Sequence, residues 1–198
     1  MDSAVDMTRR IYGALLGQAV ADSIGATFEG QTPEWLHGRF ETSEVMFLYS
    51  ADAPRRYTDD TEMALALAEY LVSADTIESQ SLMQSFVDRY DVRRGYGRGT
   101  RRLVDAFRLS VADYEVLVES LFPGGSYGNG AAMRAAPVGL RFSDANTIWE
   151  QTRMSAWPTH RHELGIEGAQ LIALAAHFAA TRTTVSPREI AELSLIHI

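Results

Sequence analysis

Apolar residues recur at helical spacing along most of this chain. Between Val5 and Ile24 a large apolar residue returns about every four positions, with Gly and Ala at many of the positions between. This spacing predicts an amphipathic helix that can pack closely against its neighbours. Its large apolar residues are Ile11, Leu15, Leu16, Val20 and Ile24.

The strongest helical pattern follows Thr58. The polar segment Thr58-Asp59-Asp60-Thr61-Glu62 is typical of a helix N-terminus. The predicted apolar face of this helix consists of Met63, Leu65, Leu67, Ala68, Leu71 and Val72.

Further helices are predicted from the same periodicity, separated by loops rich in Gly or Pro. They cover residues 76–90, 103–109, 114–121, 131–140, 143–153 and 163–180, and a short one begins near Thr32. Residues 45–49 are a weak strand candidate, and the capping box Ser186-Pro187-Arg188-Glu189 announces one more helix. No alternation of strands and helices and no fixed repeat is present, so we expect an all-α fold, a single compact multi-helix domain.

Composition restricts the classes of partner. The 198 residues are 46% hydrophobic and carry a net charge of −8, and Cys is absent. A negative chain has no bulk attraction for nucleic acid or anionic lipid, and no long apolar run predicts a membrane span. The acidic N-terminal residues differ from a signal peptide, so we expect a cytoplasmic protein.

Three segments carry candidate chemistry, each with a structural alternative. Thr58, Asp59 and Asp60 offer hard oxygen ligands for Mg²⁺, Mn²⁺ or Ca²⁺, or else simply cap a helix. The loop Gly125-Ser126-Tyr127-Gly128-Asn129-Gly130 can cradle phosphate with backbone N–H groups, or else only turns the chain between helices. His160 and His162 form an H-x-H pair that can bind a metal, or else these residues cap a helix or face solvent.

Taken in order, these segments resemble the ADP-ribosylglycohydrolase family, all-α enzymes that remove ADP-ribose from modified proteins or small adducts. The resemblance spans residues 11 to 180 and is nearest to the serine-linked ADP-ribosyl hydrolases. Four motifs carry it: Gly13-Ala14-Leu15-Leu16-Gly17-Gln18-Ala19-Val20-Ala21-Asp22-Ser23-Ile24-Gly25 through Glu29, Tyr57-Thr58-Asp59-Asp60-Thr61, Gly125-Ser126-Tyr127-Gly128-Asn129-Gly130-Ala131-Ala132-Met133-Arg134, and Thr159-His160.

The resemblance implies a role for each matching residue. Thr58, Asp59 and Asp60 would supply part of a two-Mg²⁺ site, in which Mn²⁺ is an alternative ion. Glu29 would be the gating or acid/base carboxylate. The remaining matches would hold the diphosphate and ribose or line the ADP-ribose cleft: Gly125, Ser126, Tyr127, Gly128, Asn129 and His160.

The chain departs from the family pattern at its C-terminal end. The family completes its metal site with an Asp-x-Asp-Asp-Thr motif on a later helix, and no such motif follows Ala180. With these metal ligands missing, we expect weak metal binding and impaired hydrolysis. Residues 193–198 read like a translated sequencing adapter, so we expect a partial domain over residues 5–192 and a non-native tail over residues 193–198. The alternative is a non-catalytic ADP-ribose-binding module or a structural relative. The motifs leave open the linkage that is cleaved (serine, arginine, poly-ADP-ribose or an acetylated adduct) and the oligomeric state.

Overall fold

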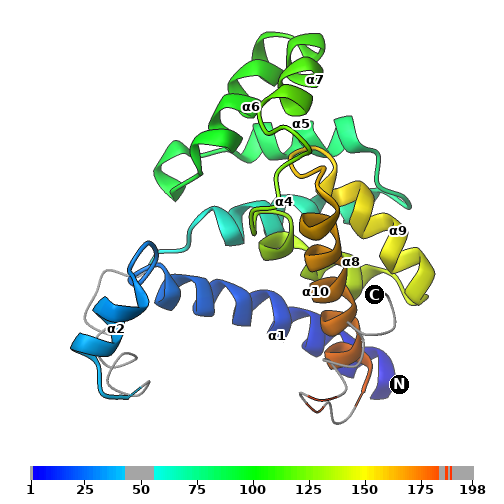
Figure 1. Ribbon diagram of the computed structural model, residues 1–198. Helices are drawn as coiled ribbons and strands as arrows, with labels where there is room; N and C mark the ends of the chain where they lie inside the picture. The colour runs from blue at the N-terminus through cyan, green and yellow to red at the C-terminus, as the bar shows by residue number, and fades with distance from the viewer. Residues whose placement is uncertain (1, 43–55, 183–185, 187, 189–198) are drawn as a thin grey trace.

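The computed structural model describes residues 2–42 and 56–182, together with 186 and 188, and all regular elements in these residues are helical. The expected all-α class is therefore confirmed (Figure 1). The α-helices are α1 (Asp2–Gly25), α2 (Pro33–Arg39), α4 (Asp59–Ser73), α5 (Ser79–Arg89), α6 (Arg98–Leu109), α7 (Val111–Ser120), α8 (Ala136–Arg141), α9 (Ala145–Ala156) and α10 (Glu163–Thr181). Two 3-10 turns, η1 (Val92–Arg94) and η2 (Ala132–Arg134), lie between them.

Helix α4 runs through the middle of the molecule and supplies much of the core (Figure 1). Met63, Leu67 and Leu71 recur every four residues and are buried against α5, η2 and α8. The predicted apolar face of this helix is thus confirmed at these three positions. Val72 is 88% exposed, so the prediction that it faces the core was wrong. Successive side chains on an α-helix are rotated by about 100°, and Val72 therefore points away from the core that Leu71 faces.

Helix α10 crosses the molecule beside α8 and α9 (Figure 1). Small residues allow the close approach: a Cβ added to Gly139 of α8 would lie 1.8 Å from the carbonyl oxygen of Ala173 in α10. By length and composition α10 could also cross a membrane. One such helix is weak evidence for a span, since the core helix of a globular domain has the same composition, and Ile166, Ala169 and Ala173 of α10 are fully buried.

Several predicted boundaries were wrong. Helices α5, α6 and α7 begin at Ser79, Arg98 and Val111 instead of the predicted residues 76, 103 and 114. Residues 131–140 form η2 and α8 instead of one helix, because Pro137 has no N–H to continue the ladder and its ring would clash with the preceding turn. Helix α9 is capped by Asp144, whose Oδ2 accepts from Thr147 N at 2.8 Å, and not by Ser143. The strand candidate at residues 45–49 and most of the capping box at 186–189 lie outside the described residues.

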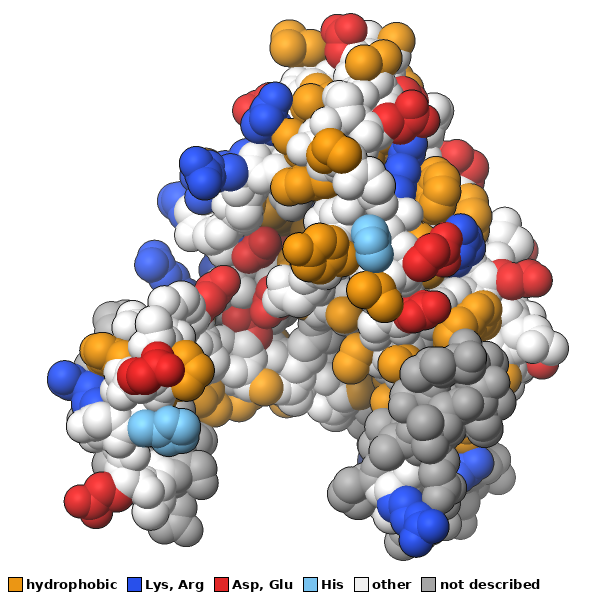
Figure 2. All heavy atoms as spheres, in the orientation of Figure 1, with side chains coloured by type: hydrophobic (Ala, Val, Ile, Leu, Met, Phe, Trp, Pro, Cys, Tyr) orange, Lys and Arg blue, Asp and Glu red, His pale blue; other side chains and the backbone are white. Residues whose placement is uncertain are grey.

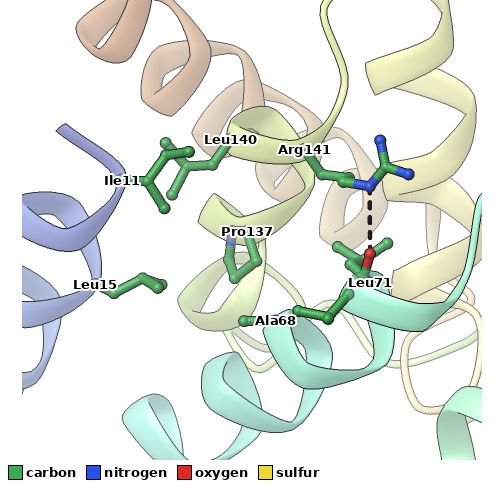
Figure 3. Close-up of a pocket in the computed structure, with 8 residues that line it drawn as sticks. Ile11, Leu15, Ala68, Leu71, Pro137, Leu140 and Arg141 are labelled. Carbon is green, nitrogen blue, oxygen red and sulfur yellow. Dashed lines mark hydrogen bonds between the residues drawn. The ribbon is translucent and has the colours of Figure 1, made fainter. Parts of the chain in front are cut away.

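An apolar pocket of about 400 Å³ separates α1 from α4 and α8 (Figure 3). Ile11 and Leu15 point from α1 toward Pro137 and Leu140 of α8. The polar group nearest to it is the guanidinium of Arg141, whose Nε donates to the carbonyl of Leu71 at 3.2 Å. On the same helix Leu16 and Val20, predicted to pack against neighbours, are 52% and 46% exposed. This pocket offers apolar packing and no chemistry.

Candidate active site

The N-terminus of α4 presents two carboxylates at the end of the helix that carries partial positive charge. Thr58 is the N-cap, and its Oγ1 accepts from Asp60 N at 3.3 Å. Asp59 and Asp60 follow in the first turn and line a pocket, together with Glu29 from the turn after α1. The segment Thr58-Asp59-Asp60 therefore supplies both the N-cap of α4 and two of the carboxylates of the pocket.

Asp22 of α1 holds this helix end in place, a role that the sequence did not reveal. Its Oδ2 accepts from Thr58 N at 2.8 Å and from Thr61 N at 3.2 Å. The hydroxyls of Thr58 and Thr61 also donate to the same carboxylate. One signal was present in the sequence, since Asp22 is the only acid in residues 11–25, where the first helix consists mostly of small and apolar residues. Its carboxylate fixes the position of the first turn of α4 relative to α1.

Burial and neighbouring negative charge raise the pKa of Asp59 and of Asp60. Burial raises the pKa of Asp59 to about 6, and the charges of Asp60, Glu29 and Asp22 add to the effect. The pKa of Asp60 rises to about 6, first through burial and then through Asp22 and Glu29. Concentrated negative charge of this kind favours a bound cation, because a cation relieves both the repulsion and the cost of burial.

The glycine-rich loop before η2 lies against the start of α10. Gly125 has φ +89°, and a Cβ there would lie 2.3 Å from the backbone nitrogen of His162. Within the loop, Gly128 N donates to Ser126 Oγ at 3.4 Å. Tyr127 is 72% exposed and lies edge-on to the His162 ring at 5.3 Å. Gly125 thus supports the loop from behind, and Tyr127 projects outside the pocket lining.

His160 is on the inner wall of the pocket and is only 6% exposed. Its ring packs so closely on the loop that a Cβ at Gly130 would lie 2.6 Å from Cε1. Burial, and then the positive charge of Arg134, lower the pKa of His160 to about 3, so the ring is neutral at physiological pH. His162 instead caps α10, with Nδ1 accepting from Leu164 N at 3.1 Å. His160 therefore lines the pocket, whereas His162 is the N-cap of α10.

One pocket of about 250 Å³ gathers most of the residues singled out from the sequence. It lies where α4 begins, and Figure 2 shows acidic side chains around a hollow in this part of the molecule. The predicted residues that line it are Glu29, Asp59, Asp60, Ser126, Gly128, Asn129 and His160; Thr58, Gly125 and Tyr127 are outside the lining. Sequence reasoning missed a further part of the lining, formed by Gly95, Gly97, Gly99, Thr100, Leu103 and Phe122. Thr159, which the sequence analysis named only within the Thr159-His160 motif, also lines the pocket.

The donor set suits a hard cation but is incomplete. Carboxylate oxygens of Asp59 and Asp60 are the ligands that Mg²⁺ and Mn²⁺ accept. The hydroxyl of Thr58 is already engaged by Asp22 and by Asp60 N. Within the described residues no group of three or more His, Asp or Glu side chains is arranged to hold a metal ion. In this part of the chain the acidic turn of α4 therefore offers carboxylate oxygens without a third ligating side chain beside them.

Comparison with known proteins gives a family match over nearly the whole chain. Residues 3–196 match the model of the ADP-ribosylglycohydrolase family. The ADP-ribosylhydrolase ARH3 of Xenopus tropicalis is 36% identical over 184 residues, covering 86% of this chain and 50% of that protein. The human ARH3 is 32% identical, with the same coverage. The ADP-ribosyl-[dinitrogen reductase] glycohydrolase of Rhodospirillum rubrum is 30% identical over 78% of this chain and 52% of its own. The chain spans about half the length of these curated relatives.

Proposed function

Because the chain belongs to the ADP-ribosylglycohydrolase family, we propose that it acts in hydrolysis of the bond between ADP-ribose and a protein side chain or small adduct. The observation that carries the proposal is the convergence on one pocket of Glu29, the acidic turn of α4 and the glycine-rich loop. A diphosphate requires hydrogen-bond donors and neutralisation of its charge. The glycine-rich loop would supply donors, and a cation held by the acidic turn of α4 would neutralise the charge.

The loop residues bind the substrate in this proposal. Ser126, Gly128 and Asn129 face the pocket and present backbone N–H groups and short polar side chains to the diphosphate. Tyr127, exposed at the rim, stacks on an outer part of the substrate such as the adenine. Gly125 lets the loop lie close to the start of α10, because a Cβ at this position would meet His162 N.

Thr58, Asp59 and Asp60 form one side of the proposed Mg²⁺ site, with Mn²⁺ as a second possible ion. The cation, when bound, would polarise ribose oxygens as positive charge develops at the anomeric carbon. The chain's own contribution is to hold the two carboxylates at the pocket wall, through the Thr58 cap and the Asp22 hydrogen bonds. The incomplete donor set supports our expectation of weak metal binding and impaired turnover.

Glu29 is the proposed acid/base group. It lies in the turn that follows α1, lines the same pocket as Asp59 and Asp60, and is exposed to solvent. From there its carboxyl can exchange protons with water and with the oxygen that leaves the anomeric carbon. Leaving-group protonation is the step that an oxocarbenium-like transition state requires.

The test is release of ADP-ribose from an ADP-ribosylated peptide, with Mg²⁺ and with EDTA. We expect slow, Mg²⁺-dependent release that is lost in Glu29→Gln and in Asp60→Asn. Glu69→Gln is the matched control, because Glu69 is on the same helix as Asp60 but is exposed and pairs with Arg89. No release by the protein in any metal, together with no binding of ADP-ribose, would refute the proposal.

A second candidate function is an ADP-ribose-binding module without turnover. It is favoured by the absence, within the described residues, of a group of three metal-ligating side chains. Isothermal calorimetry with ADP-ribose distinguishes the two functions. Binding that is unaffected by EDTA, with no release of ADP-ribose from the peptide, supports the module.

A further inference from the structure

A buried arginine connects the glycine-rich loop to the wall that carries His160. Arg134 is 1% exposed, and its guanidinium donates to the carbonyl oxygens of Gly130 at 2.9 Å and Ser155 at 3.0 Å. Nη2 also donates to Thr159 Oγ1 at 2.8 Å. Burial lowers the pKa of Arg134 to about 10, which leaves the group charged at neutral pH. A guanidinium has donors only, so the direction of each bond is fixed.

The direction of the first bond fixes the next one. Thr159 Oγ1 accepts from Arg134, and its own proton remains to be donated. The His160 ring nitrogen Nδ1 is 2.8 Å from the same oxygen. If Nδ1 carried a proton, the Thr159 hydroxyl would accept twice and its O–H, which is buried, would have no acceptor among the described residues. Buried donors are almost always satisfied, so Thr159 donates and Nδ1 accepts.

Nε2 of His160 then carries the ring proton. Among the described residues Thr159 is the only hydrogen-bond partner of this ring, so Nε2–H is free for a ligand. The edge of the ring with Nε2 faces the glycine-rich loop: Cβ atoms added at Gly128 and Gly130 would lie 3.6 and 3.0 Å from Nε2. His160 and these glycines line the same pocket.

We propose that Arg134 and Thr159 are positioning residues that hold His160 as its neutral Nε2–H tautomer, so that this ring donates a hydrogen bond to an oxygen acceptor of the bound nucleotide. The inference rests on the proposed function for the identity of the ligand, but the tautomer itself is a property of the free protein. It assigns His160 to ligand binding and excludes it as the base, because Nδ1 is occupied and Nε2 already has its proton.

The tautomer is measured by long-range ¹⁵N–¹H correlation of the uniformly ¹⁵N-labelled protein at pH 7, without ligand. We expect His160 to show the Nε2–H pattern. His177 is an internal reference of opposite type, because its Nδ1 faces the carbonyl of Gly139 at 3.2 Å and must donate. His160 in the Nδ1–H form, or protonated on both nitrogens, would overturn the proposal.

Substitution of Thr159 separates positioning from folding. Thr159→Val keeps the shape and removes the hydroxyl, so we expect the His160 pattern to become mixed while His177 is unchanged. Thr159→Ser keeps the hydroxyl and should restore the wild-type pattern. An unchanged pattern in Thr159→Val would refute the role of Thr159, and the wild-type spectrum still tests the tautomer if this variant fails to fold.

Ligand binding provides the second measurement. Affinity for ADP-ribose should fall about three- to tenfold in Thr159→Val and recover in Thr159→Ser, as expected for a weakened hydrogen bond. Equal affinity in both variants would refute the claim that the oriented N–H serves the ligand. Absence of ADP-ribose binding by the wild-type protein with the expected tautomer would instead count against the proposed function alone.

Discussion

Replacing Asp22 tests the idea that α1 positions the acidic turn of α4. In Asp22→Ala, two backbone N–H groups and two hydroxyls lose an ionised acceptor. Hydrogen bonds to charged groups contribute about 1.5–3 kcal/mol each, but neighbouring bonds are not additive and water can reach this half-buried site. Relief of the repulsion between Asp22 and Asp60 offsets part of the loss. We expect the free energy of unfolding to fall by about 2–4 kcal/mol.

Urea unfolding followed by far-UV circular dichroism measures this change, and the corresponding fall in Tm is about 4–16 °C. Asp6→Ala is the control on the same helix, since Asp6 is exposed and makes an i,i+4 ion pair with Arg10 at 2.8 Å. It should cost less than about 0.5 kcal/mol. If Asp22→Ala were as stable as Asp6→Ala, the argument that Asp22 anchors the helix end would be wrong.

Three further predictions concern the core, the pocket and the loop. Tyr114→Phe removes a buried hydroxyl that donates to a backbone carbonyl at 2.7 Å, and should lower the free energy of unfolding by about 1–2 kcal/mol in urea; no change would mean that water replaces the bond. Because the pKa values of Asp59 and Asp60 are raised from 3.8 to about 6, the folded state binds their protons more tightly than the unfolded chain does. Their contribution to stability is therefore lost as pH rises from about 4 to about 6, and the double Asn variant should gain Tm relative to wild type over that window; a parallel pH profile for both proteins would contradict this. Gly125→Ala places a Cβ 2.3 Å from His162 N at a positive φ, and should cost about 2–4 kcal/mol in thermal unfolding, whereas a neutral result would show that the loop can move away from α10.

Local pattern predicted the helices well where it agreed with packing. The start of α4 at Thr58 and its buried positions Met63, Leu67 and Leu71 follow from capping chemistry and the 3.6-residue period. The sequence also determined the family, because four motifs in order are far more specific than any single one. The starts of α8 and α9 were missed because they do not depend on periodicity. The ring of Pro137 prevents one continuous helix before α8, and the carboxylate of Asp144 caps α9.

The motifs identified most of the candidate site residues, but they did not show which of these side chains line the pocket and which lie outside it. Tyr127 and His162 have residue types as suitable for a site as Asn129 and His160, yet the fold turns Tyr127 outward and uses His162 as a helix cap. Side-chain direction depends on how the loop and α10 pack, which residue spacing does not encode.

Long-range contacts decided what the sequence could not. Asp22 and Thr58 are 36 positions apart, and Arg134 and Thr159 are 25 apart, so neither hydrogen-bonded pair produces a local pattern. The sequence by itself determined the helical class, the family and the residue types available for chemistry. The tertiary structure alone decided which carboxylates repel one another, which nitrogen of His160 faces the pocket and which threonine orients it, because electrostatics and hydrogen bonding depend on distances in space.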